Sequence, residues 1–429
     1  MTDRPGKAAP GTAAKTVPGL AARRAALTLL QAVLWQGRSL EAALPRALRN
    51  VEDGPDRALA RNIASLTLRW LPDLDHLIDS HTKKRLADDS RPRMVLRIAL
   101  VQALVLETPA HAVISTALPL VEGGPRRLVH GVLSAALKDE DPLPPHPSLP
   151  DLWQVRWSHR WGEAVAEAAA ASLAKPAPLD IGHGPGVTVE GGESLAPGHV
   201  RFPADQRADD IPGFSGSAIW VQDIAASLPV RLLAPQPGER IADLCAAPGG
   251  KTMQLAAAGA SVTAIDNAAR RLDRLRDNLA RTDLSAEVIE SDLRAITPEE
   301  PFDAVLLDAP CSATGIFRRH PDVLHLRNPG DMKALLDTQA ALLDHAAALT
   351  KSDGRLVYAV CSLEPEEGEG QVAAFLERHP EWTADPPPAG TLPPGIPATE
   401  AGFVRTLPGM LSEHGGCDGF FMARLVRSG

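Results

Sequence analysis

The C-terminal half of this 429-residue chain alternates short apolar runs with segments of helical length. The runs, in order from residue 238, are RIADLC, SVTAID, AEVIES, FDAVLLD and GRLVYAVC. Strands that alternate with helices in this way form a parallel sheet with helices on both faces. The sequence therefore predicts an α/β fold with a doubly wound, mostly parallel sheet over residues 236–429. A last apolar run, GFFMARLVR, is predicted to be an antiparallel edge strand.

The N-terminal part of the chain is predicted to be all helical. Apolar residues recur at helical spacing in AARRAALTLLQAVLWQ, DRALARNIASLTLRWLPDLDHLI and RPRMVLRIALVQALVLE, and Asp56 is expected to cap the second of these segments. The proline-rich stretch DPLPPHPSLP then breaks the helical pattern. The predicted divisions are a flexible tail (1–20), a helical domain (21–140), a proline-rich linker (141–150), a small subdomain (151–235) and the α/β domain (236–429).

The charge of the chain is unevenly distributed. The net charge is −9, but residues 1–138 contain 20 Lys and Arg against 12 Asp and Glu, whereas the remainder contains 24 against 41. A basic helical domain beside an acidic body is typical of a protein that binds RNA through one arm, and a solvated helical surface explains the charge equally well. No apolar run reaches membrane-spanning length and no signal-peptide pattern opens the chain, so a cytoplasmic protein is expected.

The run DLCAAPGGKT (243–252) follows a predicted strand and opens a predicted helix. Its glycines let backbone amides approach a ligand closely, although its spacing is neither that of a phosphate-binding P-loop nor GxGxxG. Acidic residues lie at or just after the carboxyl ends of the next three strands: Asp266, Asp292 and Asp308. Carboxylates there suit the hydroxyls of an adenosine and a cationic sulfonium, and they suit a polyphosphate poorly. A single Asp at a strand end is usually a turn or cap residue, whereas three beside a glycine-rich turn indicate a ligand site.

Two of the four cysteines occupy comparable places, and the spacing of all four is not that of a metal site. Cys311 follows the fourth predicted strand and Cys361 follows the fifth, so both thiols are expected in one crevice. Paired thiols suit covalent catalysis on an unstacked cytosine. Addition of a thiolate to C6 makes C5 nucleophilic enough to take up a methyl group, after which a base removes the C5 proton and the thiolate leaves. Asp308 is placed to hydrogen-bond the base at N3. The residues alone leave open which cysteine attacks.

These motifs together resemble the NOL1/NOP2/Sun family of RNA cytosine-5 methyltransferases, and the resemblance covers nearly the whole chain. It is strongest for the bacterial members that act on 16S ribosomal RNA. DAPC followed at this distance by a second Cys-Ser motif is highly specific for the family. The matching segments are VQDIAASLP (221–229), DLCAAPGGKT (243–252), DAPCSATGIFRRHPD (308–322), YAVCSLEPEEGE (358–369) and CDGFFMARL (417–425).

The resemblance implies a fold, an activity and a role for each matching residue. The fold would be a Rossmann-like methyltransferase domain with a mostly parallel seven-stranded sheet, preceded by an all-α NusB-like RNA-binding domain. Cys361 would be the nucleophile, and Cys311 would assist product release. The implied contacts to S-adenosylmethionine are Cys245, Ala246, Ala247, Pro248, Gly249, Gly250, Lys251, Asp266, Asp292 and Asp308. A monomer without a metal is expected, and 16S RNA is favoured as the substrate.

Some positions depart from the family pattern or leave a choice open. Ala313 replaces a usual glycine, and Val360 replaces a usual threonine. Two roles are equally favoured for Arg318, Arg319 and His320: contact with RNA, or a structural ion pair. The tryptophans at 153, 157 and 161 share a helical face and are interpreted as domain packing, and Cys417 as a structural residue. Three other functions stay open: a non-catalytic RNA-binding or ribosome assembly factor, a transfer RNA cytosine-5 methyltransferase, and a small-molecule or protein methyltransferase.

Overall fold

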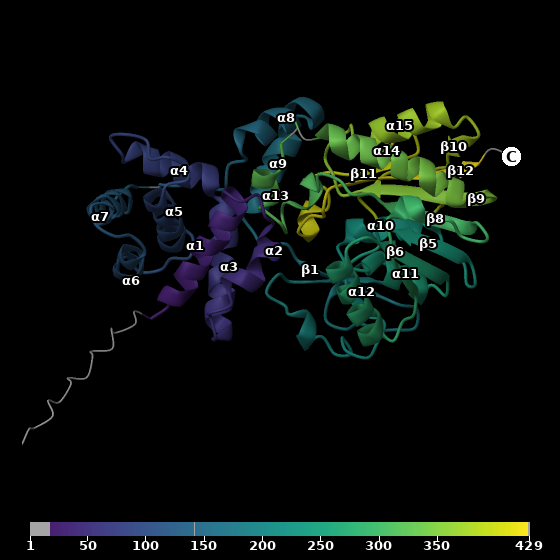
Figure 1. Ribbon diagram of the computed structural model, residues 1–429, viewed down its shortest axis with the longest axis horizontal. Coiled ribbons are helices and arrows are strands. Elements are labelled where there is room, and N and C mark those ends of the chain that lie inside the picture. The colour runs from purple at the N-terminus through teal and green to yellow at the C-terminus, as the bar shows by residue number, and fades with distance from the viewer. Residues whose placement is uncertain (1–17, 141, 329, 331, 428–429) are drawn as a thin grey trace, which may run out of the picture. The chain divides into compact units, whose positions relative to one another are not determined.

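The computed structural model describes residues 18–140, 142–328, 330 and 332–427. The chain forms two compact units, Met1–Ser148 and Leu149–Gly429. The first unit is built from helices, and the second contains two β-sheets with helices around them (Figure 1). Across the described residues, no helix combines the length and the apolar character needed to cross a membrane.

The first unit confirms the predicted helical character of the N-terminal part. One predicted segment is wrong in detail, because DRALARNIASLTLRWLPDLDHLI divides into α3 and α4 at Trp70, where Pro72 occupies the first turn of α4. Asp56 is not the cap of α3: the residue at that position is Asp53, and its side chain makes no capping hydrogen bond. The helices are α1 (Leu20–Leu34), α2 (Leu40–Ala47), α3 (Gly54–Arg69), α4 (Leu71–Ser80), α5 (Arg91–Leu104), α6 (Ala110–Ala117) and α7 (Pro125–Ala136).

Some of the positive charge in this unit is structural. The guanidinium group of Arg93 is fully buried and donates to both carboxylate oxygens of Asp79, at 2.6 and 3.0 Å. Arg97 donates in the same two-pronged way to Asp75, with both distances at 2.7 Å. Two-pronged pairs between α4 and α5 fix the packing of these helices. The cations left for a partner are therefore fewer than the composition suggests.

The second unit begins with two helices and a small antiparallel sheet. Trp153 and Trp157 are buried, and the Trp157 ring lies 5.3 Å from the ring of Phe317. This confirms that the tryptophan stripe is packing. The region 176–215, where the sequence gives only a weak strand signal, contains three of the four strands of a sheet in the order β2-β3-β1-β4. The elements are α8 (Asp151–Trp161), α9 (Glu163–Leu173), β1 (Leu179–His183), β2 (Glu193–Ala196), β3 (His199–Phe202) and β4 (Ile219–Val221).

The main sheet has the order β10-β12-β9-β8-β5-β6-β7, with β11 paired to β12. Strands β5 to β9 pair with one another in parallel, as predicted. Its strands are β5 (Arg240–Leu244), β6 (Ser261–Asp266), β7 (Glu287–Glu290), β8 (Phe302–Asp308), β9 (Thr350–Val360), β10 (Trp382–Ala384), β11 (Val404–Thr406) and β12 (Phe420–Arg427). The helices before and between them are α10 (Ile224–Leu233), α11 (Gly250–Ala257), α12 (Ala269–Thr282), α13 (Val323–Leu326), α14 (Met332–Leu349) and α15 (Glu369–Arg378).

Helices cover both faces of the main sheet (Figure 1). Neighbouring residues of β8 show the two layers: Leu307 packs with α14 and α15, and Leu306 packs with α10. Both are fully buried, so each leucine contributes about 1.5–3 kcal/mol of apolar burial. A strand that buries both faces needs consecutive apolar residues, which the stretch AVLL within FDAVLLD provides.

The last strand is antiparallel, as predicted, but the prediction that it lies at an edge is wrong. β12 pairs with β9 on one side, and β10 and β11 pair with it as well. Its side chains Phe421, Ala423 and Leu425 are consequently buried. The two flanking strands have three residues each, which is too short to give a periodic signal in the sequence.

Candidate active site

The main sheet opens a cleft at the carboxyl ends of its central strands. β5 lies between β6 and β8, so the chain leaves β5 toward one side of the sheet and later returns on the other. Ligands bind in the crevice that such a reversal creates. The cleft has a volume of about 460 Å³. It is lined by Cys245, Ala247, Asp266, Asn267, Arg271, Asp292, Leu293, Arg294, Asp308, Ala309, Pro310, Cys311, Ala313, Arg327, Thr338, Leu342 and Cys361.

The glycine-rich loop forms one wall of this cleft. Gly249 adopts φ of 104°, which favours glycine, and a Cβ there would lie 3.0 Å from Leu275. Its N–H closes a turn by donating to the carbonyl of Ala246, at 2.9 Å. The side chain of Asp266 anchors the loop from β6 by accepting the N–H of Ala247, at 3.2 Å. The loop therefore needs its glycine for conformation and for helix packing.

The predicted cofactor residues divide into two groups. Those that line the cleft are Cys245, Ala247, Asp266, Asp292 and Asp308. The others shape the loop or support it: Ala246, Pro248, Gly249, Gly250 and Lys251. The lining combines carboxylates with the apolar side chains of Leu293 and Leu342. This mixture suits an adenosine with a sulfonium, because the carboxylates accept from hydroxyl and ammonium groups and the apolar side chains cover a purine.

Arginines at the cleft were missed by the sequence analysis. Arg271 pairs with Asp266 at 3.0 Å, and Arg294 pairs with Asp292 at 2.7 Å. The hydrogen bond from Arg294 lowers the pKa of Asp292 to about 2. Arg327 donates to the carbonyl of Ser312 at 3.0 Å and is otherwise exposed. In the sequence these arginines look like ordinary surface residues, and only the fold brings them to the cleft.

Lys251 reaches Asp308 across the end of β5. Its Nζ lies 2.7 Å from Asp308 Oδ2 and 5.4 Å from the centre of the Phe420 ring. Burial alone would lower the pKa of Lys251, but the Asp308 carboxylate outweighs burial and raises it. The charge of Cys361 acts in the same direction. A charged ammonium group thus lies beside a carboxylate and near a cysteine.

The two predicted cysteines meet in the cleft. Their strands pair in parallel with Asp308 opposite Ala359, and the Sγ atoms lie 3.4 Å apart. The hydrogen bond between the thiols and the burial of Cys311 raise the pKa of Cys311 well above its usual range. Cys311 therefore keeps its proton and can donate it to the sulfur of Cys361.

The loop after Cys311 is bonded to the loop after Cys361. Gly315 donates its N–H to the carbonyl of Cys361, at 3.0 Å. Thr314 accepts the N–H of Leu363 through its hydroxyl, at 2.9 Å. Ala313 adopts φ of 59°, a left-handed conformation that favours glycine.

Arg318 and Arg319 form structural ion pairs. Both donate to Asp223 Oδ2, at 2.9 and 2.7 Å, and both donate to Asp418, at 2.7 and 3.2 Å. Asp223 and Asp418 are buried, and the charges of the two arginines hold the pKa of Asp223 far below its usual range although burial opposes this. Of the two interpretations left open by the sequence, the ion pair is the one that the structure shows.

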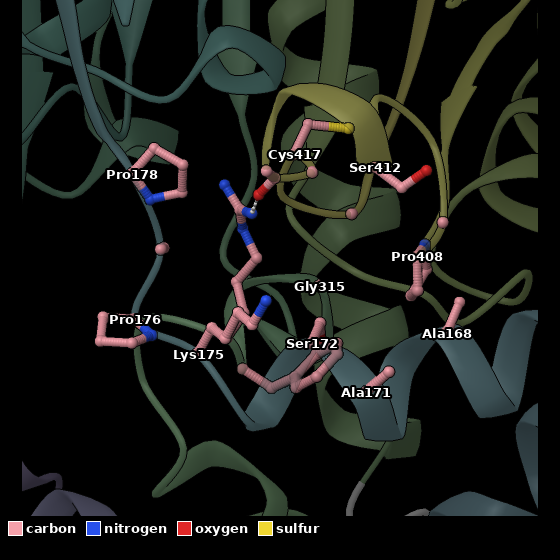
Figure 2. Close-up of a pocket in the computed structure, with 17 residues that line it drawn as sticks. Ala168, Ala171, Ser172, Lys175, Pro176, Pro178, Gly315, Pro408, Ser412 and Cys417 are labelled. Atoms are coloured by element: carbon pink, nitrogen blue, oxygen red, sulfur yellow. Dashed lines mark hydrogen bonds between the residues drawn. The ribbon is translucent and has the colours of Figure 1, made fainter. Parts of the chain in front are cut away.

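A second cavity, of about 340 Å³, lies between α9 and the segment 408–419 (Figure 2). Its walls are mainly alanine, glycine and proline residues from α9, from residues 175–178 and from the segment 408–419. Cys417 is buried beside it, in keeping with a structural role. Gly315 connects this cavity to the cleft region, because it lines the cavity and donates to Cys361. None of the predicted catalytic or cofactor residues lines it.

Asp243 is a buried carboxyl group under the glycine-rich loop. Its Oδ2 accepts the hydroxyl of Thr252 at 2.6 Å, while Oδ1 has no hydrogen-bond partner among the described residues. Burial raises the pKa of Asp243 to about 7. The neutral carboxyl group is thus the favoured form in the folded state at acidic pH.

Replacing Asp243 with asparagine should remove a pH dependence of stability. The unfolded carboxyl group loses its proton near pH 4 and the folded one near pH 7, so the wild type loses stability as pH rises between these values. The asparagine variant keeps a neutral amide. Relative to this variant, the free energy of unfolding of the wild type should fall by about 3–4 kcal/mol from pH 4 to pH 8. Urea unfolding at a series of pH values measures this, and parallel profiles for the two proteins would contradict it.

Comparison with known proteins identifies the family. Residues 230–426 match the family model of 16S rRNA methyltransferase RsmB/F, and residues 20–138 match that of the NusB family. The chain is 34% identical over 441 residues to ribosomal RNA small subunit methyltransferase B of Cronobacter sakazakii, covering 94% of this chain and 98% of the relative. It is 36% identical over 435 residues to the protein of that name from Xylella fastidiosa, covering 95% and 98%.

Solved structures support the same fold. The crystal structure of PH0851 is 23% identical and gives a TM-score of 0.73 over 96% of this chain and 99% of that one. Because its identity is low, this likeness shows the fold alone. The sequence relatives, by contrast, match along nearly the full length of both chains. The chain therefore belongs to the RsmB/F family of 16S rRNA methyltransferases, and it is an S-adenosylmethionine-dependent RNA methyltransferase with a NusB-like N-terminal domain.

Proposed function

We propose that this enzyme methylates C5 of a cytosine in 16S ribosomal RNA through a covalent bond between Cys361 and C6 of the base. The observation that carries the proposal is the pair of thiols 3.4 Å apart in the cleft, at the ends of β8 and β9. A methyltransferase that acts on a nitrogen or on a hydroxyl has no use for two such thiols, because those atoms already carry a lone pair.

The two cysteines have different roles in this proposal. Cys311 retains its proton, so it suits a hydrogen-bond donor better than a nucleophile. Cys361 adds to C6, and C5 then gains the nucleophilic character that the unmodified base lacks. S-adenosylmethionine supplies the electrophilic methyl group. After a base takes up the C5 proton, the electron pair of the C5–H bond re-forms the C5–C6 double bond and Cys361 leaves C6. The thiol of Cys311 stabilises the departing thiolate through the hydrogen bond between the two sulfurs.

Lys251 and Asp308 are the residues proposed to hold the base. Negative charge develops on N3 and O2 of cytosine when a thiolate adds to C6, and a nearby ammonium group stabilises it. Lys251 provides a positively charged ammonium group that interacts with Cys361, and its ion-pair partner Asp308 lines the cleft. The carboxylate of Asp308 accepts from the exocyclic amino group or from a protonated N3. Of these two contacts, the one to the exocyclic amino group distinguishes cytosine from uracil, because uracil presents a carbonyl at C4.

RNA binding is assigned to the helical domain and to exposed arginines of the cleft. Residues 1–138 carry an excess of positive charge, and Arg327 is an exposed cation at the cleft. The curated relatives are named as small-subunit rRNA methyltransferases, which favours 16S RNA over transfer RNA. We propose that the enzyme acts as a monomer in the cytoplasm, where ribosome assembly supplies the RNA. Light scattering during size-exclusion chromatography tests the monomer.

Bisulfite sequencing tests the proposed reaction. Protein-free 16S RNA that lacks 5-methylcytosine is incubated with the enzyme and S-adenosylmethionine, in parallel with Cys361→Ala. One cytosine should become protected from deamination with the wild type and stay unprotected with the variant, because the thiolate is needed to activate C5. Transfer RNA and an early small-subunit particle serve as parallel substrates.

Each other outcome points to a different function. Protection in transfer RNA alone would indicate a transfer RNA methyltransferase. Absence of protection in every RNA, with folded protein that binds RNA, would indicate a non-catalytic RNA-binding factor. Protection that survives the substitution of Cys361 would show that this cysteine is not the nucleophile.

A further inference from the structure

Glu367 lies behind the two active-site cysteines and does not line the cleft. Its side chain is fully buried just before α15. In the part of the chain that the structure describes, no cation pairs with its carboxylate. A buried carboxylate without a cation costs free energy unless several hydrogen-bond donors surround it. The groups that donate hydrogen bonds to Glu367 therefore show which parts of the chain its carboxylate fixes in position.

These donors come from both cysteine loops. Ser312, which directly follows Cys311, donates its N–H to Glu367 Oε1 at 2.8 Å and its hydroxyl to Oε2. Ser362, which directly follows Cys361, donates its hydroxyl to the same Oε2. The two serine hydroxyl oxygens lie 3.1 Å apart. One carboxylate thus joins the residues next to both thiols.

A third element completes the surroundings of Glu367. Gln339 on α14 donates its amide to Glu367 Oε1 and to the carbonyl of Pro310, both at 2.9 Å. The hydroxyl of Tyr358 on β9 donates to the backbone carbonyl of Glu367, at 2.7 Å. Because the backbone and both carboxylate oxygens are held, Glu367 is rigid enough to fix the position of other groups.

We propose that Glu367 is a positioning residue that sets the separation of the two active-site thiols by binding the loops that carry them. This rests on the two-cysteine mechanism proposed above. A displacement of about 1 Å between reacting groups can lower a rate by a factor of about 10². A residue that holds both cysteine loops in position therefore affects kcat. It bears little on substrate binding, because Glu367 does not reach the cleft lining.

The charge of Glu367 also acts on Cys311. The hydrogen bond from Cys361 and burial are the main causes that raise the pKa of Cys311, and the negative charges of Cys361 and Glu367 add to them. Tyr358 is also a titratable group that interacts with this thiol. Loss of the Glu367 charge should therefore make Cys311 more reactive toward an alkylating reagent.

The substitution Glu367→Gln keeps the size of the side chain and removes its charge. We expect kcat for RNA methylation to fall about 10²-fold, while KM for 16S RNA and Kd for S-adenosylmethionine stay within about threefold. The rate of Cys311 alkylation by iodoacetamide at pH 8, followed by peptide mass spectrometry, should rise about fivefold or more. The alkylation assay needs neither RNA nor turnover, so it tests Glu367 even if the proposed reaction is wrong.

Glu366→Gln is the matched control, one residue earlier in the chain. Its carboxylate pairs with Arg156 and Arg160 and is about one-third exposed, so kcat and the alkylation rate should stay at wild-type values. If Glu367→Gln lowers only the melting temperature and leaves kcat and alkylation unchanged, Glu367 is merely structural and the proposal is overturned. If that variant does not fold, Ser312→Ala and Ser362→Ala remove one donor each, and unchanged kcat in both would overturn the proposal.

Discussion

Replacing Cys361 with alanine should abolish methyl transfer to RNA, and replacing Cys311 with alanine should trap the enzyme on its RNA. Without Cys361 no adduct forms, so the rate should fall at least about 10⁴-fold. Without Cys311 the adduct forms, but the departing thiolate loses the hydrogen bond that now spans 3.4 Å between the sulfurs. The covalent complex is measured as a band of reduced mobility in denaturing gels that requires both RNA and S-adenosylmethionine.

The pattern of the two variants distinguishes the roles of the cysteines. Adduct in Cys311→Ala and none in Cys361→Ala is the expected result, and the double variant should also show none. The reverse pattern would make Cys311 the nucleophile. Cys417→Ala is the control, since this buried cysteine lies outside the cleft, and its activity should stay within about threefold of the wild type.

Replacing Asp223 with asparagine should destabilise the second unit by about 3–5 kcal/mol. The variant keeps the shape of the side chain but leaves Arg318 and Arg319 with one buried carboxylate fewer. Because both arginines also contact Asp418, the whole cluster loses its charge balance. Urea unfolding at pH 7 and 25 °C, followed by circular dichroism, gives the change in the free energy of unfolding.

An exposed pair provides the comparison for this variant. Asp273 pairs with Arg276 at 3.2 Å on α12, and both side chains are largely in solvent. Asp273→Asn should therefore cost less than about 1 kcal/mol. Equal costs for the two variants would show that the buried cluster contributes no more than a surface pair.

The acid dependence of this cluster has a definite sign. The pKa of Asp223 is lowered in the folded state, so its contribution to stability is present near neutral pH and is lost as the pH falls below the usual range of a carboxyl group. Burial raises the pKa of Asp418 to about 6, and the contribution of Asp418 has the opposite sign, since it is lost as the pH rises toward 6. Removing Asp223 should therefore weaken the loss of stability in acid.

The central strands could be predicted from the sequence because most of their residues are apolar and are buried on both faces of the sheet. β8 is the clearest case, with Leu306 and Leu307 packed on opposite sides of the sheet. The strands around β12 could not be predicted, because three residues show no period. The helix break at Trp70 was missed since the apolar spacing continues across it, and only Pro72 marks it.

The thiols of the candidate site could be placed together from topology alone. Cys311 and Cys361 follow adjacent parallel strands, whose carboxyl ends must meet at one edge of the sheet. The role of Glu367 had no such signal, because it is one of four glutamates in a short acidic segment. Their burial and partners differ only in the folded chain: Glu364 meets Arg156, Glu366 meets Arg156 and Arg160, and Glu369 meets Arg405.

The outermost strands of the main sheet are both short. β7 has four residues with Glu287 and Glu290 at its two ends, and β10 has three residues. A long, flat, apolar edge would recruit strands from other molecules through its free backbone groups, whereas short or charged edges resist such pairing. The sheet thus offers a neighbouring copy little to pair with, which protects the protein against edge-to-edge aggregation at high concentration.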